Sequence, residues 1–250
     1  MAVNGKSVLI TGAGRGMGRY IAHSFAKASA RITIADVDAN GVETVAAELR
    51  SMGATVLAVT VDVRNESQVK DMVDRAAREF GAIDVLVNNA AIVTHSHWWR
   101  VDPEQSPPWP RVRDLGKDVW DRVIDTNLGG TFLCTKHVLP YMEAQRSGHI
   151  VNLHGGALPG QAGVSPYVVS KDALRTFTQF LAEEEREWNV CVLIVTPGTA
   201  MATEGAPEAV LRDFPAPESL GDAFVRVAEL DMTYSGKLLN LKGGGLQPVE

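Results

Sequence analysis

Short apolar runs alternate with longer amphipathic stretches along most of this chain. The apolar runs occupy residues 8–11, 31–36, 55–61, 84–88, 149–153, 190–195 and 237–241. Helical patterns lie between them, most clearly at residues 42–52, 67–80 and 173–188. Continuous apolar strands are typical of a parallel sheet buried on both faces, and strand–helix alternation favours right-handed crossovers. We therefore expect an α/β fold: a doubly wound, Rossmann-like parallel sheet of about seven strands, in a single domain spanning residues 1–250.

One long segment, residues 94–117, interrupts this alternation. It carries the prolines Pro103, Pro107, Pro108 and Pro110 and the tryptophans Trp98, Trp99 and Trp109. Prolines at this density prevent a regular helix, and a long loop in a compact domain is usually functional or disordered. Three tryptophans argue against simple disorder. We expect this loop to cover an apolar substrate or to pack against a neighbouring subunit, although packing on its own domain is an open alternative.

Composition excludes several classes of protein. The chain has 250 residues, of which 45% are hydrophobic and 22% charged, as in an ordinary soluble domain. A net charge of −6 without long runs of one sign argues against nucleic acid or an anionic membrane as the main partner. The sequence shows no membrane-spanning run and no signal-peptide layout, so a cytoplasmic protein is expected. Cys134 and Cys191 lie in apolar surroundings, which predicts buried thiols rather than a disulfide or metal site.

A glycine-rich turn follows the first predicted strand. It reads Thr11-Gly12-Ala13-Gly14-Arg15-Gly16-Met17-Gly18 and leads into a helical pattern. Glycines allow the backbone to approach a ligand closely, and the N-terminus of the next helix attracts phosphate. The absence of a Gly-Lys-Ser/Thr ending excludes an ATP or GTP P-loop. The turn therefore predicts a nucleotide site of another kind.

Asp36, at the end of the second predicted strand, bears on the choice of nucleotide. An acidic group there accepts hydrogen bonds from the adenosine ribose and repels a 2′-phosphate, which favours NAD over NADP. Arg15 in the glycine turn is a signal in the opposite direction, because it is able to approach a phosphate. The alternative for Asp36 is a structural role as a turn or helix-capping residue.

Tyr167 and Lys171 stand four residues apart in a predicted helix. This spacing places the phenol and the ammonium on one face, one turn apart. A nearby cation lowers the pKa of a phenol and so suits it to proton transfer. The pair alone is a weak signal, because a solvated lysine beside a core tyrosine is common.

Taken together, these motifs resemble the short-chain dehydrogenase/reductase family over nearly the whole chain. Gly12-x-x-x-Gly16-x-Gly18 matches its cofactor turn, Asp62-Val63 its adenine-contacting pair, and Asn88-Asn89-Ala90-Ala91 its motif after the fourth strand, with alanine as the last residue. Asn127 matches the family's helix asparagine, Tyr167 and Lys171 its catalytic pair, and Pro197-Gly198 its turn after the sixth strand. Six motifs in the right order make the match specific.

The resemblance implies an oxidoreductase that transfers a hydride between NAD(H) and a small alcohol or ketone. Tyr167 would pass the proton, Lys171 would bind the nicotinamide ribose and lower the pKa of Tyr167, and Asn127 would hold a water connecting Lys171 to solvent. Thr199 either contacts the nicotinamide end or only shapes its turn. The implied cofactor-binding residues are Gly12, Arg15, Gly16, Met17, Gly18, Asp36, Asp62, Val63, Asn89, Ala90, Ala91, Tyr167, Lys171, Pro197, Gly198 and Thr199.

The chain departs from the family pattern where a substrate-orienting serine normally follows the fifth strand. Counting three residues from Asn152 gives Gly155 at that place, whereas counting thirteen residues back from Tyr167 gives His154. Three interpretations follow: His154 replaces the serine as a hydrogen-bond donor, Tyr167 works without such a donor, or the chain binds cofactor without turnover. Besides a protein that binds cofactor without turnover, a further alternative function is the reduction of an imine or of another bond that does not need the serine.

Three further expectations concern metals and partners. His95 and His97 lack a third nearby ligand, so no metal site is predicted. The resemblance implies a homodimer or homotetramer, with helices over residues 116–145 and 164–189 at the interface. It also suggests that residues 203–218 form a mobile flap over the substrate. If the chain binds cofactor without turnover, we expect it to be a catalytically silent NAD sensor or scaffold of the same fold.

Overall fold

The computed structural model describes residues 3–93, 111–155, 163–204 and 208–249. Most of the proline- and tryptophan-rich loop predicted at residues 94–117 therefore lies outside the described residues, as do His95, His97 and all three of its tryptophans. Its described end contains a short 3₁₀ turn, Val112–Asp114.

Eight strands form one sheet in the order β3-β2-β1-β4-β5-β6-β7-β8. Their bounds are β1 Ser7–Thr11, β2 Arg31–Asp36, β3 Val56–Thr60, β4 Val85–Asn88, β5 Gly148–Leu153, β6 Val190–Thr196, β7 Leu238–Asn240 and β8 Gln247–Val249. The first seven strands are parallel, which confirms the predicted fold class and each predicted strand. The eighth, antiparallel to β7, is additional to the predicted seven. It is short, fully exposed and contains Pro248, which suits an edge strand and leaves little pattern in the sequence.

The helices connect the parallel strands. Their bounds are α1 Gly16–Lys27, α2 Ala39–Ser51, α3 Glu66–Phe80, α4 Lys117–Ile124, α5 Gly130–Gln145, α6 Ser165–Glu184, α7 Glu208–Asp213 and α8 Ala223–Val227. A π-helical turn, Asp125–Gly129, joins α4 to α5. None of the described helices is long and apolar enough to cross a lipid bilayer.

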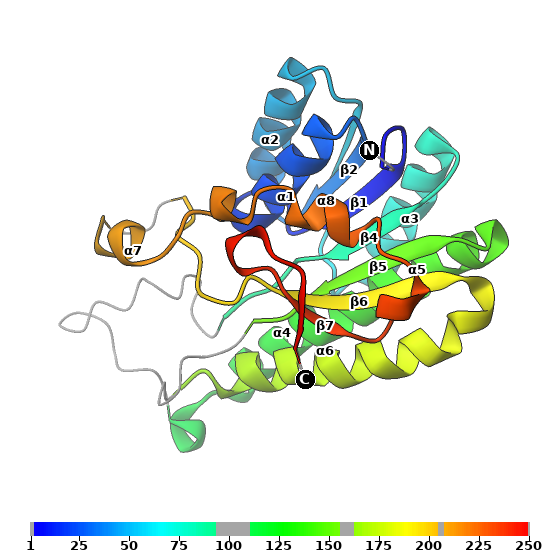
Figure 1. Cartoon of the computed structure of the whole chain (residues 1–250). Helices are drawn as coiled ribbons and strands as arrows, with labels where there is room; N and C mark the ends of the chain where they lie inside the picture. Colours follow the sequence, from blue (N-terminus) through cyan, green and yellow to red (C-terminus); the bar gives the residue numbers. More distant parts are fainter. Residues whose placement is uncertain (1–2, 94–110, 156–162, 205–207, 250) are drawn as a thin grey trace.

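Helices cover both faces of the sheet (Figure 1). α1, α2 and α8 pack on one face, where Phe25, Leu49 and Phe224 are fully buried. α3, α5 and α6 pack on the other face, which includes Met72 and Met142. Burying apolar strands from both sides explains why the strands read as continuous hydrophobic runs.

The winding direction of the sheet reverses between β1 and β4, which are neighbours in space. The chain builds β2 and β3 outward on one side of β1, and then β4 to β7 outward on the other side. In doubly wound sheets, ligands bind beyond the carboxyl ends of the strands at such a reversal. The glycine turn after β1 and the asparagine motif after β4 both lie at this place.

Both cysteines are free and buried, as predicted. Cys134 lies in α5 and Cys191 in β6, and burial raises the pKa of each thiol to about 12. The described residues contain no cluster of three His, Cys, Asp or Glu side chains placed to hold a metal ion.

Candidate active site

The glycine turn after β1 adopts a shape that only glycine fits. Gly12 has φ of +65°, and a Cβ atom there would stand 2.7 Å from the Ala90 Cα. A Cβ on Gly18 would overlap the Gly12 carbonyl oxygen. These close approaches hold the turn against the start of α1, whose first backbone N–H groups have no intrahelical partner. The result is a cradle suited to a phosphate group.

The loop after β4 is tied directly to this turn. Asn89 Nδ2 donates to the carbonyl oxygens of Thr11 at 2.9 Å and Gly12 at 2.8 Å. Thr11 Oγ1 in turn accepts hydrogen bonds from the backbone N–H groups of Asn89 and Ala90. Asn89 therefore shapes the cradle through its side chain, and its predicted place in the cofactor site is a structural one.

Asp36 lies beside the turn, at the end of β2. Its Oδ2 accepts a hydrogen bond of 3.0 Å from the Gly14 N–H, and Oδ1 accepts one from the Asp38 N–H. The alternative of helix capping falls to Asp38, which caps α2 by accepting from the Gly41 N–H. The bonds of Asp36 to two backbone N–H groups fit the alternative of a turn residue, and its carboxylate also borders the cavity described next.

A cavity of about 840 Å³ opens over the carboxyl ends of the strands. The predicted site residues in its wall are Gly12, Arg15, Met17, Asp36, Asp62, Val63, Asn89, Ala90, Ala91, His154, Tyr167, Lys171, Pro197, Gly198 and Thr199. Gly16, Gly18 and Asn127 are not in the wall. The cavity has the size of sites for cofactors and small ligands. Its glycine cradle at one end and Asp36 beside it fit a dinucleotide.

Asp62 is already engaged by a neighbour. Arg64 donates to both Asp62 carboxylate oxygens, at 2.6 to 3.0 Å, and this hydrogen bonding keeps the pKa of Asp62 below its usual value. Gln68 also accepts from the Asp62 N–H. Asp62 is therefore part of an ion pair with Arg64, and both residues line the cavity. Its predicted contact with adenine stays a prediction.

Tyr167 and Lys171 lie together in the first turns of α6, as their spacing predicts. The Lys171 ammonium is buried and donates to the Leu153 carbonyl oxygen at 2.8 Å, and it stands 5.9 Å from the centre of the Tyr167 ring. Within the described residues, the Tyr167 hydroxyl has no hydrogen-bond partner. With no partner among the described residues, the phenol is available to bind a substrate atom in the cavity.

Burial, rather than the lysine, dominates the acidity of this pair. It raises the pKa of Tyr167 to about 12 and lowers the pKa of Lys171 to about 8. The expected lowering of the Tyr167 pKa by Lys171 is therefore not seen in this structure. At neutral pH the phenol keeps its proton, and the lysine remains mostly charged.

Asn127 lies in the π-helical turn between α4 and α5, and its side chain is fully buried. Its amide bonds the backbone of Ile92 twice, accepting from the N–H at 2.8 Å and donating to the carbonyl at 3.0 Å. It also donates to Ser170 Oγ at 3.0 Å. The side chain is thus occupied by protein partners, and the predicted role of Asn127 in holding a water stays a prediction. Asn127 joins the loop after β4 to α6, one residue before Lys171.

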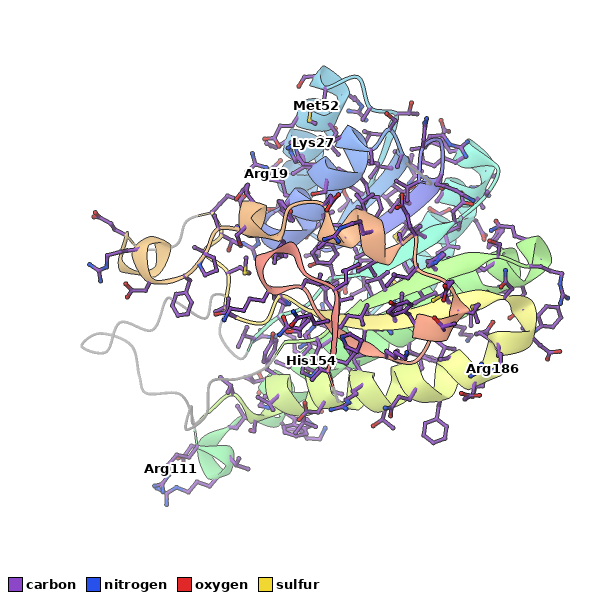
Figure 2. The ribbon with its side chains drawn as sticks, in the orientation of Figure 1. Arg19, Lys27, Met52, Arg111, His154 and Arg186 are labelled. Atoms are coloured by element: carbon purple, nitrogen blue, oxygen red, sulfur yellow. The ribbon has the colours of Figure 1, made fainter. Side chains whose placement is uncertain are left out.

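Gly155 is the residue that faces the Tyr167 hydroxyl. A Cβ atom built on Gly155 would overlap that hydroxyl oxygen and stand 3.1 Å from the ring carbon Cζ. The position counted from Asn152 is thus the one next to the Tyr167 hydroxyl, and which residue replaces the usual serine stays a prediction. The His154 ring, labelled in Figure 2, also borders the cavity, but its Nε2 pairs with Asp172 on α6 at 3.3 Å.

Several residues of the cavity wall were not found from the sequence. Val249 reaches it through the unpredicted strand β8, and Arg122 reaches it from α4. Neither residue belongs to a motif, because each is placed by the packing of its element. The flap residue Glu204 also contacts the glycine turn, for which the sequence carries no local signal.

Comparison with known proteins identifies the family. The family model described as short chain dehydrogenase matches residues 6–210. The chain therefore belongs to the short-chain dehydrogenase family, whose members are oxidoreductases that bind a nicotinamide cofactor.

Two curated relatives show the range of this similarity. The 3-oxoacyl-[acyl-carrier-protein] reductase FabG of Thermotoga maritima is 30% identical, with 98% of this chain and 99% of that protein covered. The (2S)-[(R)-hydroxy(phenyl)methyl]succinyl-CoA dehydrogenase subunit BbsD of Thauera aromatica is 35% identical, with 79% of this chain and 74% of that protein covered.

Solved structures share the fold. A short-chain type dehydrogenase/reductase from Mycobacterium marinum is 28% identical, with a TM-score of 0.81 over 97% of this chain and 96% of that one. A metagenomic short-chain oxidoreductase, solved in complex with NADP, has a TM-score of 0.79 over the whole of both chains. Its identity is 23%, so it supports the fold alone.

Proposed function

We propose that this protein interconverts a small alcohol and its ketone with NAD(H), using Tyr167 as the proton donor and acceptor. The observation that carries the proposal is the position of Tyr167 in the cavity wall, one helical turn from a buried Lys171, with no hydrogen-bond partner for its hydroxyl in the part of the chain that the structure describes. The glycine cradle and Asp36 supply a dinucleotide site at the other end of the same cavity. A protein that only bound the cofactor would have no need of this proton-transfer pair.

The chain's own residues account for the proton and the position of the substrate. When bound, the nicotinamide gives or takes the hydride. The Tyr167 phenol donates its proton to the developing alkoxide during reduction and removes the proton during oxidation. Lys171 holds positive charge beneath the ring, which favours the phenolate formed in each reduction. Asn127 fixes the segment that carries both residues.

Gly155 bears on how the substrate oxygen is held. Because the Tyr167 hydroxyl occupies the space of a side chain at residue 155, we favour a site in which Tyr167 alone binds the oxygen. The pairing of His154 with Asp172 supports the same conclusion, since it directs the imidazole Nε2 toward α6. The names of both curated relatives, an oxoacyl reductase and a hydroxyacyl dehydrogenase, agree with alcohol–ketone chemistry.

The proposal is tested with a panel of secondary alcohols, diols and ketones, each with NAD(H) and NADP(H), followed by nicotinamide absorbance. We expect turnover of at least one alcohol–ketone pair. Tight NADH binding without turnover of any compound would instead support the silent sensor, and turnover of imines alone would support the imine reductase.

The preference for NAD rests on Asp36. Asp36→Asn removes the negative charge but keeps an acceptor for the Gly14 N–H. Hydrogen bonds to charged groups contribute about 1.5–3 kcal/mol, so we expect kcat/KM with NAD to fall about tenfold or more. We expect kcat/KM with NADP to rise, because repulsion of the 2′-phosphate is removed. Steady-state kinetics with both cofactors measure the ratio. Asp38→Asn is the matched control, and a wild-type preference for NADP would contradict the assignment.

We also propose that the protein is a homodimer or homotetramer assembled through α5 and α6. Phe132 on α5 is 48% exposed, and Val169 and Phe180 on α6 are 48% and 69% exposed. Exposed apolar side chains are common at interfaces, and these three lie on the two helices that the family resemblance implies. Light scattering on the wild type and on Phe180→Glu decides the point: a monomeric wild type contradicts it, and the variant is expected to shift toward monomer.

A further inference from the structure

A carboxylate from the flap occupies the first turn of α1. Glu204 Oε2 accepts a hydrogen bond of 2.7 Å from the Gly16 N–H, and Glu204 Oε1 accepts one of 2.6 Å from Arg19 Nη1. The two oxygens of one carboxylate are thus bound by a backbone donor and a guanidinium donor. The flap, residues 203–218, is far from α1 in sequence, so this contact is a property of the fold.

Glu204 supplies the anion that α1 itself lacks. The residue before the helix, Arg15, makes no side-chain capping hydrogen bond, and the first turn contains no acidic residue. Helix N-termini favour negative groups because of their free N–H groups and dipole. The same N–H groups form the glycine cradle in which a cofactor diphosphate is expected. Glu204 binds the N–H of Gly16, which lies between the cavity-lining residues Arg15 and Met17 and so belongs to the expected diphosphate site.

Arg19 is held in place independently of Glu204. Its Nε and Nη2 donate to the two Glu48 oxygens, at 2.9 and 2.8 Å, and His23 pairs with Glu48 as well. This fork leaves Nη1 directed at the same carboxylate that the Gly16 N–H binds. When Glu204 departs, both donors remain fixed around a position of anionic charge. A phosphate oxygen pair has the geometry to replace the carboxylate.

We propose that Glu204 is an internal competitor of the cofactor diphosphate and that Arg19 joins the Gly16 N–H in binding that diphosphate. The proposal rests on the nicotinamide-cofactor function above. Two anions do not share the same donors, so cofactor binding releases Glu204. Its neighbour Thr203 and nearby Met201 line the cavity, and Thr203 lies next to Gly16, so this release changes the cavity wall beside the glycine turn. Cofactor binding is thereby coupled to the start of the flap.

The size of the effect follows from exposure. The side chains of Glu204 and Arg19 are 46% and 36% exposed, and ion pairs in water contribute little. The cofactor binds only those molecules in which the Glu204 contact is broken. Its apparent affinity is therefore the intrinsic affinity multiplied by the fraction of such molecules. We expect removal of the Glu204 charge to tighten cofactor binding by about threefold to tenfold.

The test compares Glu204→Gln with the wild type and with Glu208→Gln, which removes the same charge from an exposed residue of the same flap. The dissociation constants of NADH and ADP are measured by calorimetry on the full chain, and thermal unfolding is recorded in parallel. We expect Glu204→Gln to bind both ligands more tightly and to unfold at a lower temperature. A purely structural role would weaken both properties.

Arg19→Met provides the second arm. Loss of Arg19 removes one diphosphate donor together with its hold on Glu204, so this variant is expected to bind NADH less tightly than Glu204→Gln. Equal NADH affinity in the wild type, Glu204→Gln and Glu208→Gln would overturn the proposal and leave the function intact. No binding of any nicotinamide cofactor by any variant would overturn both.

Discussion

Tyr167→Phe is expected to lower kcat by about 10³-fold while NADH affinity changes by less than about threefold. The substitution removes the only atom that we assign to proton transfer and keeps the ring that packs in the cavity wall. Cofactor contacts at the glycine cradle are far enough away to survive. Steady-state kinetics in the reduction direction and fluorescence titration with NADH measure the two quantities. Tyr141→Phe is the control, because its hydroxyl binds Asp74 on α3 instead.

The pH dependence of the wild type gives the same prediction a second readout. Reduction uses the protonated phenol, which burial maintains because the pKa of Tyr167 lies near 12. Oxidation uses the phenolate, so its rate is expected to rise as the pH increases from 7 to 10. This rise is expected to disappear in Tyr167→Phe. An oxidation rate that falls with increasing pH, or a variant with kcat close to the wild type, would remove Tyr167 from the chemistry.

Gly155→Ala is expected to lower kcat by about 10²-fold, because a displacement of about 1 Å at a reacting group has an effect of this size. The new Cβ atom would occupy the space of the Tyr167 hydroxyl and force the phenol out of position. Gly155→Ser introduces the same Cβ atom together with the hydroxyl that the family normally has. We expect Gly155→Ser to lose activity to a similar degree, since the clash precedes any benefit from the donor.

The two substitutions at residue 155 are measured with the same alcohol–ketone pair, and NADH affinity is recorded for each. His154→Ala serves as the matched control and is expected to keep kcat/KM within about threefold, because the ring pairs with Asp172. A gain in activity for Gly155→Ser would show that the site lacks a donor it has room to use. A large loss of kcat/KM for His154→Ala would instead support the interpretation that His154 replaces the serine.

The fold was largely predictable because the buried strands carry their own signal. A parallel sheet covered on both faces needs continuous apolar runs, and β1 to β7 each have one. β8 has none, because its three residues are exposed at an edge next to β7. The glycine turn was equally predictable from the sequence. The φ of +65° at Gly12 and the lack of space for a Cβ atom between residue 18 and the Gly12 carbonyl restrict these positions to glycine.

Contacts between distant segments were harder to predict than motifs. The position of the missing serine was ambiguous by one residue in the sequence, and the overlap of residue 155 with the Tyr167 hydroxyl favours Gly155. The motif alone did not indicate the raised pKa of Tyr167, because burial is a property of the folded chain. Likewise, the side-chain partners of Asn127 lie 35 and 43 residues away in the sequence.

The hydrogen bonds between Asn89 and the glycine turn also determine when the cofactor site forms during folding. The Asn89 side chain bonds backbone atoms 77 and 78 residues earlier, across the β1–β4 pairing at the centre of the sheet. Such nonlocal contacts form slowly, because a long loop must close first. A chain in which only β1, β2 and β3 have assembled still lacks half of the cradle. Cofactor capture is therefore a late event in folding, and it stabilises the central pairing only after that pairing exists.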